Sequence, residues 1–438
     1  MKKLLYLLCL INLISLSSCD QTDQSSIKPS IQETENESTR KESKIESTEK
    51  EIYNDISYEY VDEQGYYVNG YYGDETNITI PSEINEIPVY GIKNNAFINK
   101  SEITQINLPS TLVYIGVSAF IGCSNLTSIA IPEGVTILGS AFYGCCSLTN
   151  IELPSTLTSI GSNTFYGCNS LTNIEIPNGV TYIGDSAFKD CSGLTNIVVP
   201  NSVTSIGEAA FSGCSGLEKI TLPFVGNLVG SPFGYVFGKK SYPGSAPVTQ
   251  YYRGRTGEVD KIKKTVFYLP TNLTEVTITG GDIFYGAFYN CTMLTSITLG
   301  DVMFTDYVIF YNCSNLTNIE ISSCGDSIHN SAFNSCKSLT NITLPESVKV
   351  IWQYAFAECY NLTYIIIKSK EIYIYETFGI YNNLPIIYFS GTPSELIINE
   401  YSQRNFPMEN VYFYSETQPT SSGNYWYYDT DGKTPLIW

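Results

Sequence analysis

The sequence has only one histidine, His329, among its 438 residues. Imidazole titrates near neutral pH and is a frequent zinc ligand, so its scarcity argues against histidine-based acid–base catalysis and metal binding. The sequence also has no nucleophile elbow, zinc-type spacing, dinucleotide fingerprint or phosphate-binding loop. We therefore expect a protein that is not an enzyme and that needs no cofactor or metal. An enzyme with a carboxylate pair stays an alternative, because the separation of carboxylates is not visible in a sequence.

Positive charge is also scarce. Lys and Arg number 24 against 43 Asp and Glu, which gives a net charge of −19, and charged residues make up only 15% of the chain. Nucleic acids and anionic membrane surfaces require basic partners, so both are disfavoured as ligands. The chain instead contains 35 tyrosines and many Asn, Ser and Thr residues. Amphipathic rings and adaptable hydrogen-bonding groups of this kind suit a binding surface.

Long hydrophobic runs are absent after the start of the chain. Leu4–Leu16 follows two lysines and is too short to span a membrane, so residues 1–18 are interpreted as a signal peptide. The following Leu-Ser-Ser-Cys19 resembles the bacterial lipobox, which implies cleavage before Cys19 and its lipidation; an ordinary signal peptide is the alternative. Residues 19–52 are polar and predict a flexible tether. We expect an exported protein, lipid-anchored to the bacterial envelope and surface-exposed, that meets the membrane only through its anchor.

What the chain has in abundance is one repeated phrase. Leu171–Cys191 reads LTNIEIPNGVTYIGDSAFKDC, and close variants follow one another at a spacing of 21 to 23 residues, apart from one gap between Leu217 and Leu273. A fixed period in this range predicts a solenoid, in which each unit buries its apolar face against its neighbours. The copies begin at Ile103, Leu126, Leu148, Leu171, Leu194, Leu217, Leu273, Leu294, Leu316, Leu339 and Leu362.

Each unit can be interpreted with the alternation of a strand. Ile174 and Ile176 share one face, while Asn173 and Glu175 point to the other. The proline after them ends the strand, and Phe188 is expected to point inward from a short helical turn. The fold class predicted is an α/β, strand-dominated leucine-rich repeat solenoid of about eleven repeats, with a cap at each end and one insert.

Changes in the repeat set the expected domain boundaries. The cap segments have lost the phrase, and the insert contains seven basic residues against only Glu258 and Asp260. After the tether, the expected parts are an N-terminal cap at 53–98, a first repeat array at 99–223, a basic insert at 224–270, a second array at 271–367 and an aromatic C-terminal cap at 368–438.

The full unit L-T-x-I-x-I-P-x-x-V-T-x-I-G-x-x-A-F-x-x-C resembles the BspA-like leucine-rich repeats of bacterial surface proteins. Leu171–Cys191 fits it at every fixed position, and the likeness covers nearly everything after the tether. The resemblance implies a leucine-rich repeat horseshoe or arc, surface exposure, and adhesion to host matrix proteins or other cells. It does not name a ligand, because one fold serves many partners.

Two candidate binding surfaces follow from the repeats. The outward strand positions form two polar columns, which are the favoured surface for an extracellular protein partner. The prediction concerns this face as a whole and no single residue of it. Its candidate residues are Asn150, Glu152, Asn173, Glu175, Asn196, Asn318, Glu320, Asn341 and Thr343. The alternative is a glycan or envelope polymer bound by the basic insert: Lys239, Lys240, Arg253, Arg255, Lys261, Lys263 and Lys264. A structural envelope protein without an external ligand is a further alternative.

Nine cysteines recur in phase with the repeat. An exported protein can form disulfides, and neighbouring strands lie close enough for a bridge. An identical inward position in every unit is nevertheless better explained as a column of small apolar side chains, so we expect free buried thiols. Near the end of the chain, Asp429-Thr-Asp-Gly432 has too few ligands for a calcium loop and predicts a hairpin turn.

Overall fold

The computed structural model describes residues 50–61, 64–226, 231–253, 261–379, 384–400, 406, 408–420 and 423–438. The signal peptide, the lipidation site Cys19, nearly all of the tether and Arg255 lie outside these residues. The chain divides into Met1–Lys50 and Glu51–Trp438, and only the second unit is described below. Within the described residues, no helix has the length and apolar character needed to cross a membrane.

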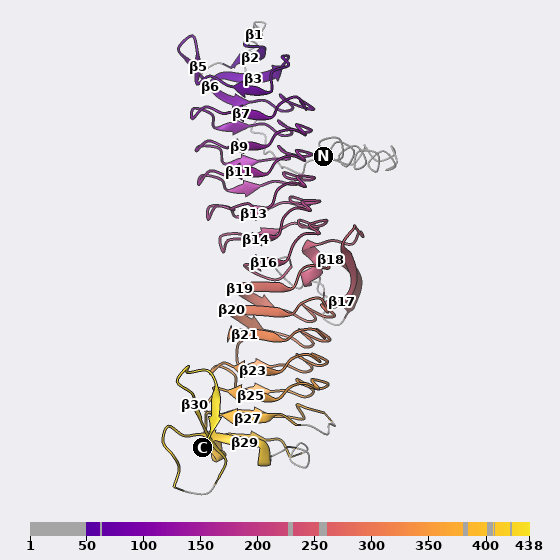
Figure 1. The fold of residues 1–438 in the computed structure, drawn as a ribbon, viewed down its shortest axis with the longest axis vertical. Coiled ribbons are helices and arrows are strands. Elements are labelled where there is room, and N and C mark those ends of the chain that lie inside the picture. The colour runs from indigo at the N-terminus through magenta and orange to yellow at the C-terminus, as the bar shows by residue number, and fades with distance from the viewer. Residues whose placement is uncertain are drawn as a thin grey trace, which may run out of the picture. The chain divides into compact units, whose positions relative to one another are not determined.

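Two parallel ladders of short strands run through the unit (Figure 1). The first ladder contains β4 (Asn77–Thr79), β7 (Gln105–Asn107), β9 (Ser128–Ala130), β11 (Asn150–Glu152), β14 (Asn196–Val198), β16 (Lys219–Leu222), β19 (Glu275–Ile283), β20 (Ser296–Phe304), β21 (Asn318–Ser323), β23 (Asn341–Leu344), β25 (Tyr364–Ile367), β27 (Ile386–Phe389) and β29 (Val411–Tyr414). The second contains β8 (Tyr114–Ile115), β10 (Ile137–Leu138), β12 (Ser159–Ile160), β13 (Tyr182–Ile183), β15 (Ser205–Ile206), β22 (Ser327–Ile328), β24 (Val350–Ile351), β26 (Ile372–Ile374) and β28 (Leu396–Ile398).

The remaining elements lie at the ends of the unit and in the insert. The N-terminal end has β1 (Lys50–Tyr53), β2 (Ile56–Val61), β3 (Gly65–Tyr71), β5 (Glu83–Ile84) and β6 (Ile87–Ile92). The insert has the 3₁₀ helix η1 (Phe233–Val236) and the hairpin of β17 (Ser245–Arg253) and β18 (Ile262–Pro270). The C-terminal end has η2 (Pro393–Glu395), η3 (Met408–Asn410), β30 (Tyr425–Tyr428) and β31 (Pro435–Ile437).

The predicted strand-dominated leucine-rich repeat solenoid is confirmed. Its helical content among the described residues is three short 3₁₀ helices. The stack has about 14 turns against the expected eleven. It begins at β4, inside the expected N-terminal cap, and continues through β27 and β29, inside the expected C-terminal cap. β4 keeps both the alternation of exposed and buried side chains and the Ile-x-Ile-Pro letters of the repeat. β27 and β29 have lost both, but they pair in parallel with the preceding turn like the other strands of the ladder.

A column of stacked phenylalanines forms the centre of the core. Phe165, Phe188 and Phe211 are fully buried, and their ring centroids follow one another at 5.3 and 5.5 Å with nearly parallel planes. The same stacking joins Phe97 to Phe165 and, after the insert, Phe288 to Phe356. Each ring covers its neighbours on both faces, so every turn depends on the next for burial of its largest side chain.

The in-phase cysteines form a second buried column, and all of them are free thiols in the structure. Cys168 donates its S–H to the carbonyl oxygen of Phe142 at 3.2 Å, and Cys191 donates to that of Phe165 at 3.1 Å. The bond recurs wherever a complete repeat precedes the cysteine. The thiol therefore fills a small apolar site and satisfies a backbone carbonyl of the preceding turn.

The insert takes part in the core. Its helix η1 lies between the turns of Phe211 and Phe288: the Phe211 N–H donates to the carbonyl of Val236, and the Phe233 N–H donates to that of Ala287, both at 2.8 Å. Phe233 packs on Phe288 with ring centroids 5.0 Å apart. The first ladder passes the insert without interruption, because β16 pairs directly with β19. The hairpin β17–β18 stands out from the side of the stack (Figure 1).

Gln250 of β17 joins the hairpin to the core and is fully buried. Its Oε1 accepts the N–H of Gly234 at 2.7 Å, and its Nε2 donates to the carbonyl of Ala287 at 3.1 Å. Nε2 also lies 3.5 Å from Sγ of Cys291, the cysteine directly after the insert. One amide thus satisfies polar groups of two adjacent turns.

We expect Gln250→Leu to lower the free energy of unfolding by about 2–4 kcal/mol, because it leaves the Gly234 N–H buried without a partner and removes a bond to Ala287. Urea denaturation followed by circular dichroism measures this. The matched control is Thr249→Val, on the neighbouring half-buried position of the same strand. Equal stability of the Leu variant and the wild type would contradict the assigned role of the amide.

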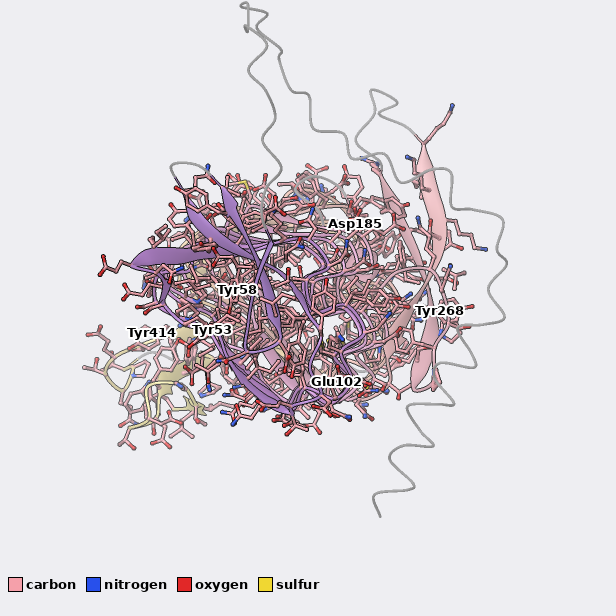
Figure 2. The ribbon with its side chains drawn as sticks, turned by 90° about the horizontal axis from the view of Figure 1, so that it is seen from above. Tyr53, Tyr58, Glu102, Asp185, Tyr268 and Tyr414 are labelled. Atoms are coloured by element: carbon pink, nitrogen blue, oxygen red, sulfur yellow. The ribbon has the colours of Figure 1, made fainter. Side chains whose placement is uncertain are left out.

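The C-terminal strands cover the end of the first ladder. Trp426 of β30 is fully buried against Ile366 and Tyr388, and its Nε1–H donates to the carbonyl of Phe389 at 3.1 Å. The turn between β30 and β31 is the predicted hairpin turn: Asp431 accepts the N–H groups of Lys433 and Thr434 at 2.8 and 2.7 Å. Viewed from above, this segment with Tyr414 lies on the side of the stack opposite to the hairpin with Tyr268 (Figure 2).

Candidate binding site on the strand face

The strand face is the outward side of the first ladder. Strand register aligns its side chains in the two expected columns: Asn150 lies beside Ser128, and Asn196 lies beside Lys219 and then Glu275. The second column places Glu152 beside Ala130. The columns arise because every turn starts its strand at the same point of the repeat.

The ladder is interrupted at the turn that contains Asn173 and Glu175. Its residues form no assigned strand, and no backbone hydrogen bond joins Asn173–Ile176 to a neighbouring turn within the part of the chain that the structure describes. The ladder therefore ends at β11 and restarts at β14. A second interruption lies between β21 and β23. There the two turns on either side both form strands, because β21 pairs with β20 and β23 pairs with β25. Among the described residues, Asn173–Ile176 is thus a turn of the stack whose peptide groups form no hydrogen bond to the neighbouring turns.

A groove of about 540 Å³ lies over this interruption. The predicted residues Asn173, Glu175 and Asn196 all line it, so the structure brings three of the nine strand-face candidates together. Val198, which is 51% exposed, adds an apolar contact surface. Asn178, Asn201, Thr221 and Thr279 complete the polar lining.

The polar groups of the groove are largely available to a ligand. Among the described residues, Asn173, Asn178 and Asn196 form no side-chain hydrogen bond, and Glu175 forms no ion pair. Asn201 is held in place by the hydroxyl of Thr279, which donates to its Oδ1 at 2.5 Å. Glu175 is the charged residue of the groove lining, and Lys219, two turns away on β16, is already paired with Glu275 at 2.9 Å. The groove offers several amide groups and one carboxylate.

Sequence reasoning missed Asn178 and Asn201, although a signal for them exists. Each directly follows the proline that ends its strand, and Pro-Asn occurs in these two consecutive repeats, whereas the corresponding prolines Pro109, Pro132 and Pro154 precede Ser or Glu. A local change in an otherwise regular repeat marks the place where the strand face changes.

The other strand-face candidates lie outside the groove. Asn150 and Glu152 are exposed on β11. Asn318 and Glu320 are exposed on β21, where Asn318 donates to the hydroxyl of Ser296 at 3.2 Å.

The last two candidates lie near the end of the exposed surface. Asn341 is exposed and Thr343 is half-buried on β23. Thr343 is aligned with Ile366 of the next turn, which Trp426 covers and which is 3% exposed. The exposed second column therefore ends at this turn.

The basic residues of the insert are partly neutralised by the protein itself. Lys239 pairs with Glu208 at 2.8 Å, and Arg253 pairs with Asp306 at 3.0 Å while its guanidinium lies over the ring of Tyr285. Lys264 lies over the ring of Tyr251 at 5.8 Å. Lys240, Lys261 and Lys263 are exposed, and Arg255 lies outside the described residues. The described lysines and arginines thus do not form one free basic patch.

His329 has a structural contact, since its Nε2 lies 2.9 Å from the carbonyl oxygen of Phe304. In the described part of the chain, no three or more His, Cys, Asp and Glu side chains are arranged to hold a metal ion.

The repeats match a known family. The BspA type leucine-rich repeat region, in six copies, matches residues 69–147, 90–218, 260–384 and 305–430, which together are more than half of the chain. The chain belongs to the BspA-type leucine-rich repeat family. No curated protein matches the sequence.

Solved structures with similarity to this BspA-type chain include two bacterial proteins. A leucine-rich repeat protein from Bacteroides ovatus is 24% identical, with 77% of this chain and 99% of that chain covered and a TM-score of 0.39. A leucine rich cell surface protein from Faecalibacterium prausnitzii is 25% identical, with 80% and 97% covered and a TM-score of 0.37.

Proposed function

We propose that this BspA-type chain is a lipid-anchored surface protein that adheres to a protein of a host or neighbouring cell, with the groove over Asn173–Ile176 as its contact site. The observation that carries the proposal is the groove at the interruption of the first ladder, where the amide side chains of Asn173, Asn178 and Asn196 have no hydrogen-bond partner among the described residues. A polar group that has no partner within the protein is available to a ligand.

The chemistry of the groove favours a polypeptide. The amides of Asn173 and Asn196 supply both donors and acceptors, which match the peptide groups of an extended chain. The exposed side chain of Val198 offers an apolar contact between them. The single uncompensated charge, that of Glu175, favours a basic or neutral segment of the partner over an acidic one.

Anchoring and location rest on the start of the chain. Lipidation of Cys19 would hold the protein on a membrane, with residues 19–52 as tether, and would keep the repeats outside the cell. Family membership supports a role in protein binding or adhesion at the surface.

The groove is tested by paired substitutions in the full chain. The double variant Asn173→Ala, Asn196→Ala is expected to weaken binding to the protein partner by roughly tenfold or more, because it removes two amide contacts at the centre of the site. The partner is first identified on an array of matrix proteins, and its affinity is then measured by surface plasmon resonance.

The matched control is Asn318→Ala with Asn341→Ala, which removes two exposed asparagines of the same outward column on turns outside the groove. Unchanged binding in the control and loss in the groove variant support the proposal. Equal loss in both variants would spread the contact over the whole strand face. Full binding by the groove variant would exclude the groove as the contact site.

Two measurements distinguish binding by the basic insert from binding by the groove: the dependence of affinity on salt, and the effect of substituting basic residues. Binding through Lys and Arg weakens steeply with ionic strength, whereas contacts of Asn, Thr and Tyr weaken less. Deletion of 224–270 is unsuitable, because it removes Phe233 and Gln250 from the core. Lys240→Ala with Lys263→Ala removes charge from exposed positions and leaves the core intact.

A further inference from the structure

A second hollow, of about 660 Å³, lies at the N-terminal end of the stack, away from the strand face. It is lined by three tyrosines from three adjacent strands: Tyr67 on β3, Tyr90 on β6 and Tyr114 on β8. The amide side chains of Gln64, Asn69 and Asn94 line it as well. Its volume lies within the range of roughly 300–1,000 Å³ that is usual for small-ligand sites.

The ring of Tyr67 is held in place by a glycine. Register sets Tyr67 beside Gly91 and Gly91 beside Tyr114. A Cβ at residue 91 would lie 2.5 Å from Cε1 of Tyr67, so only glycine lets this ring rest on the strand between the other two tyrosines. The ring centroid of Tyr67 lies 6.2 Å from those of Tyr90 and Tyr114. Tyr90 and Tyr114 remain 37% and 43% exposed.

The amide groups are oriented by hydrogen bonds that engage their oxygen atoms. The hydroxyl of Tyr67 donates to Oε1 of Gln64 at 2.8 Å. Oδ1 of Asn94 accepts the N–H of Val117 at 2.8 Å and the hydroxyl of Tyr114 at 3.3 Å. Because the oxygen atoms are occupied, the NH₂ groups of Gln64 and Asn94 are left as donors toward a ligand.

The hollow carries little net charge. Lys93 is its ionisable lining residue apart from the tyrosines, and its ammonium forms an ion pair with Glu59. An anionic ligand would have to compete with that carboxylate, and a cationic ligand would meet the ammonium of Lys93. The site therefore favours an uncharged ligand that is rich in hydroxyl groups and has an apolar face.

We propose that this hollow, the tyrosine site, binds a neutral pyranose unit of a glycan. The C–H face of a pyranose packs on exposed tyrosine rings, and its hydroxyl groups accept hydrogen bonds from the amide donors of Gln64 and Asn94. The site is distinct from the groove at Asn173 and does not depend on it. A purely structural role for the rings, as a cover over Gly91, is the alternative.

The test uses the full chain, kept in a mild detergent, with dextran, mannan and galactan as neutral probes and heparin as an anionic one. Affinity electrophoresis and isothermal titration calorimetry measure binding. We expect a neutral polysaccharide to bind, with little dependence on salt. Tyr114→Ala is expected to weaken this binding by roughly three- to tenfold, because one stacking ring is lost.

Two control variants keep the proposal falsifiable. Tyr90→Phe preserves the ring and should retain binding. Tyr182→Ala removes a tyrosine that is 40% exposed at the corresponding position of β13, where the aligned neighbours are Ser159 and Ser205, and should also retain binding. Failure of all three neutral polysaccharides to bind a protein with a native circular dichroism spectrum would overturn the proposal. So would binding to heparin alone, or equal losses in Tyr114→Ala and Tyr182→Ala.

Discussion

Phe188→Ala is expected to lower the free energy of unfolding by about 3–5 kcal/mol. Phe188 is fully buried and stacks on Phe165 and Phe211, so its loss opens a cavity and removes ring contacts on both faces. In a solenoid the coupling between neighbouring turns holds the parts of the stack together. We therefore also expect the single unfolding transition of the wild type to broaden or to split in two. Urea denaturation monitored by circular dichroism checks both results.

The end of the phenylalanine column provides the comparison for Phe188. Phe356 is almost fully buried, but its partner on one side, Phe378, lies farther away, with ring centroids 6.3 Å apart. Phe356→Ala should therefore cost less than Phe188→Ala and should leave the main transition sharp. Tyr182→Ala, on the exposed side of the same turn as Phe188, should change stability by less than about 0.5 kcal/mol. A larger loss for Phe356 than for Phe188 would refute the account of coupling through the column.

Raising the pH above about 9 is expected to destabilise the protein strongly. Burial raises the pKa of the Cys123 thiol to about 12, and burial likewise raises the pKa of Cys145, Cys191 and Cys336 well above the ordinary value. In the unfolded chain these thiols ionise near pH 9, whereas in the folded chain they stay protonated. Their contribution to stability is complete below pH 9 and is lost as the pH rises toward 12.

The size of the alkaline effect follows from the number of thiols. Each thiol that ionises only on unfolding lowers the free energy of unfolding by about 1.4 kcal/mol at one pH unit above its unfolded pKa. Because the nine in-phase thiols act together, the total loss is on the order of 10 kcal/mol at pH 10. Urea denaturation between pH 7 and 10 measures the slope.

A variant with Cys145→Ala, Cys168→Ala and Cys191→Ala is the control for the alkaline effect. Its slope should be smaller by about three protons per molecule, although its stability at pH 7 is lower because each substitution leaves a small cavity. Identical slopes in the variant and the wild type would assign the alkaline effect to other groups, such as Tyr58, whose pKa burial also raises.

The repeat alone was enough to predict the solenoid and much of its interior. Ile174, Phe188 and Cys191 recur at fixed positions, and a side chain that must be buried in every turn can only point to the common core. The same periodicity predicts which residues share the strand face, and strand register aligns Asn150 and Glu152 as expected. The family resemblance, which rests on the same residues, is confirmed by the match to BspA-type repeats.

The sequence was a poorer guide to where the stack of turns ends and to how the insert packs. β27 and β29 continue the ladder with aromatic residues, because parallel pairing is made by backbone hydrogen bonds and does not require the side chains of the repeat phrase. The sequence shows the insert only as a basic stretch without the repeat phrase. Its hairpin stands out from the side of the stack (Figure 1), but Phe233 and Gln250 lie in the core between Phe211 and Phe288, and such contacts join residues with no common spacing.

The repeat pattern is enough to predict the fold class, the period, the buried columns and the two outward columns, because each of these follows from a local pattern that every repeat restates. Three features become visible only in the folded chain: the open part of the strand face, its cover by Trp426, and the hollow that Tyr67, Tyr90 and Tyr114 share. These features depend on how a turn pairs with its neighbours, and pairing is set by the geometry of several turns at once.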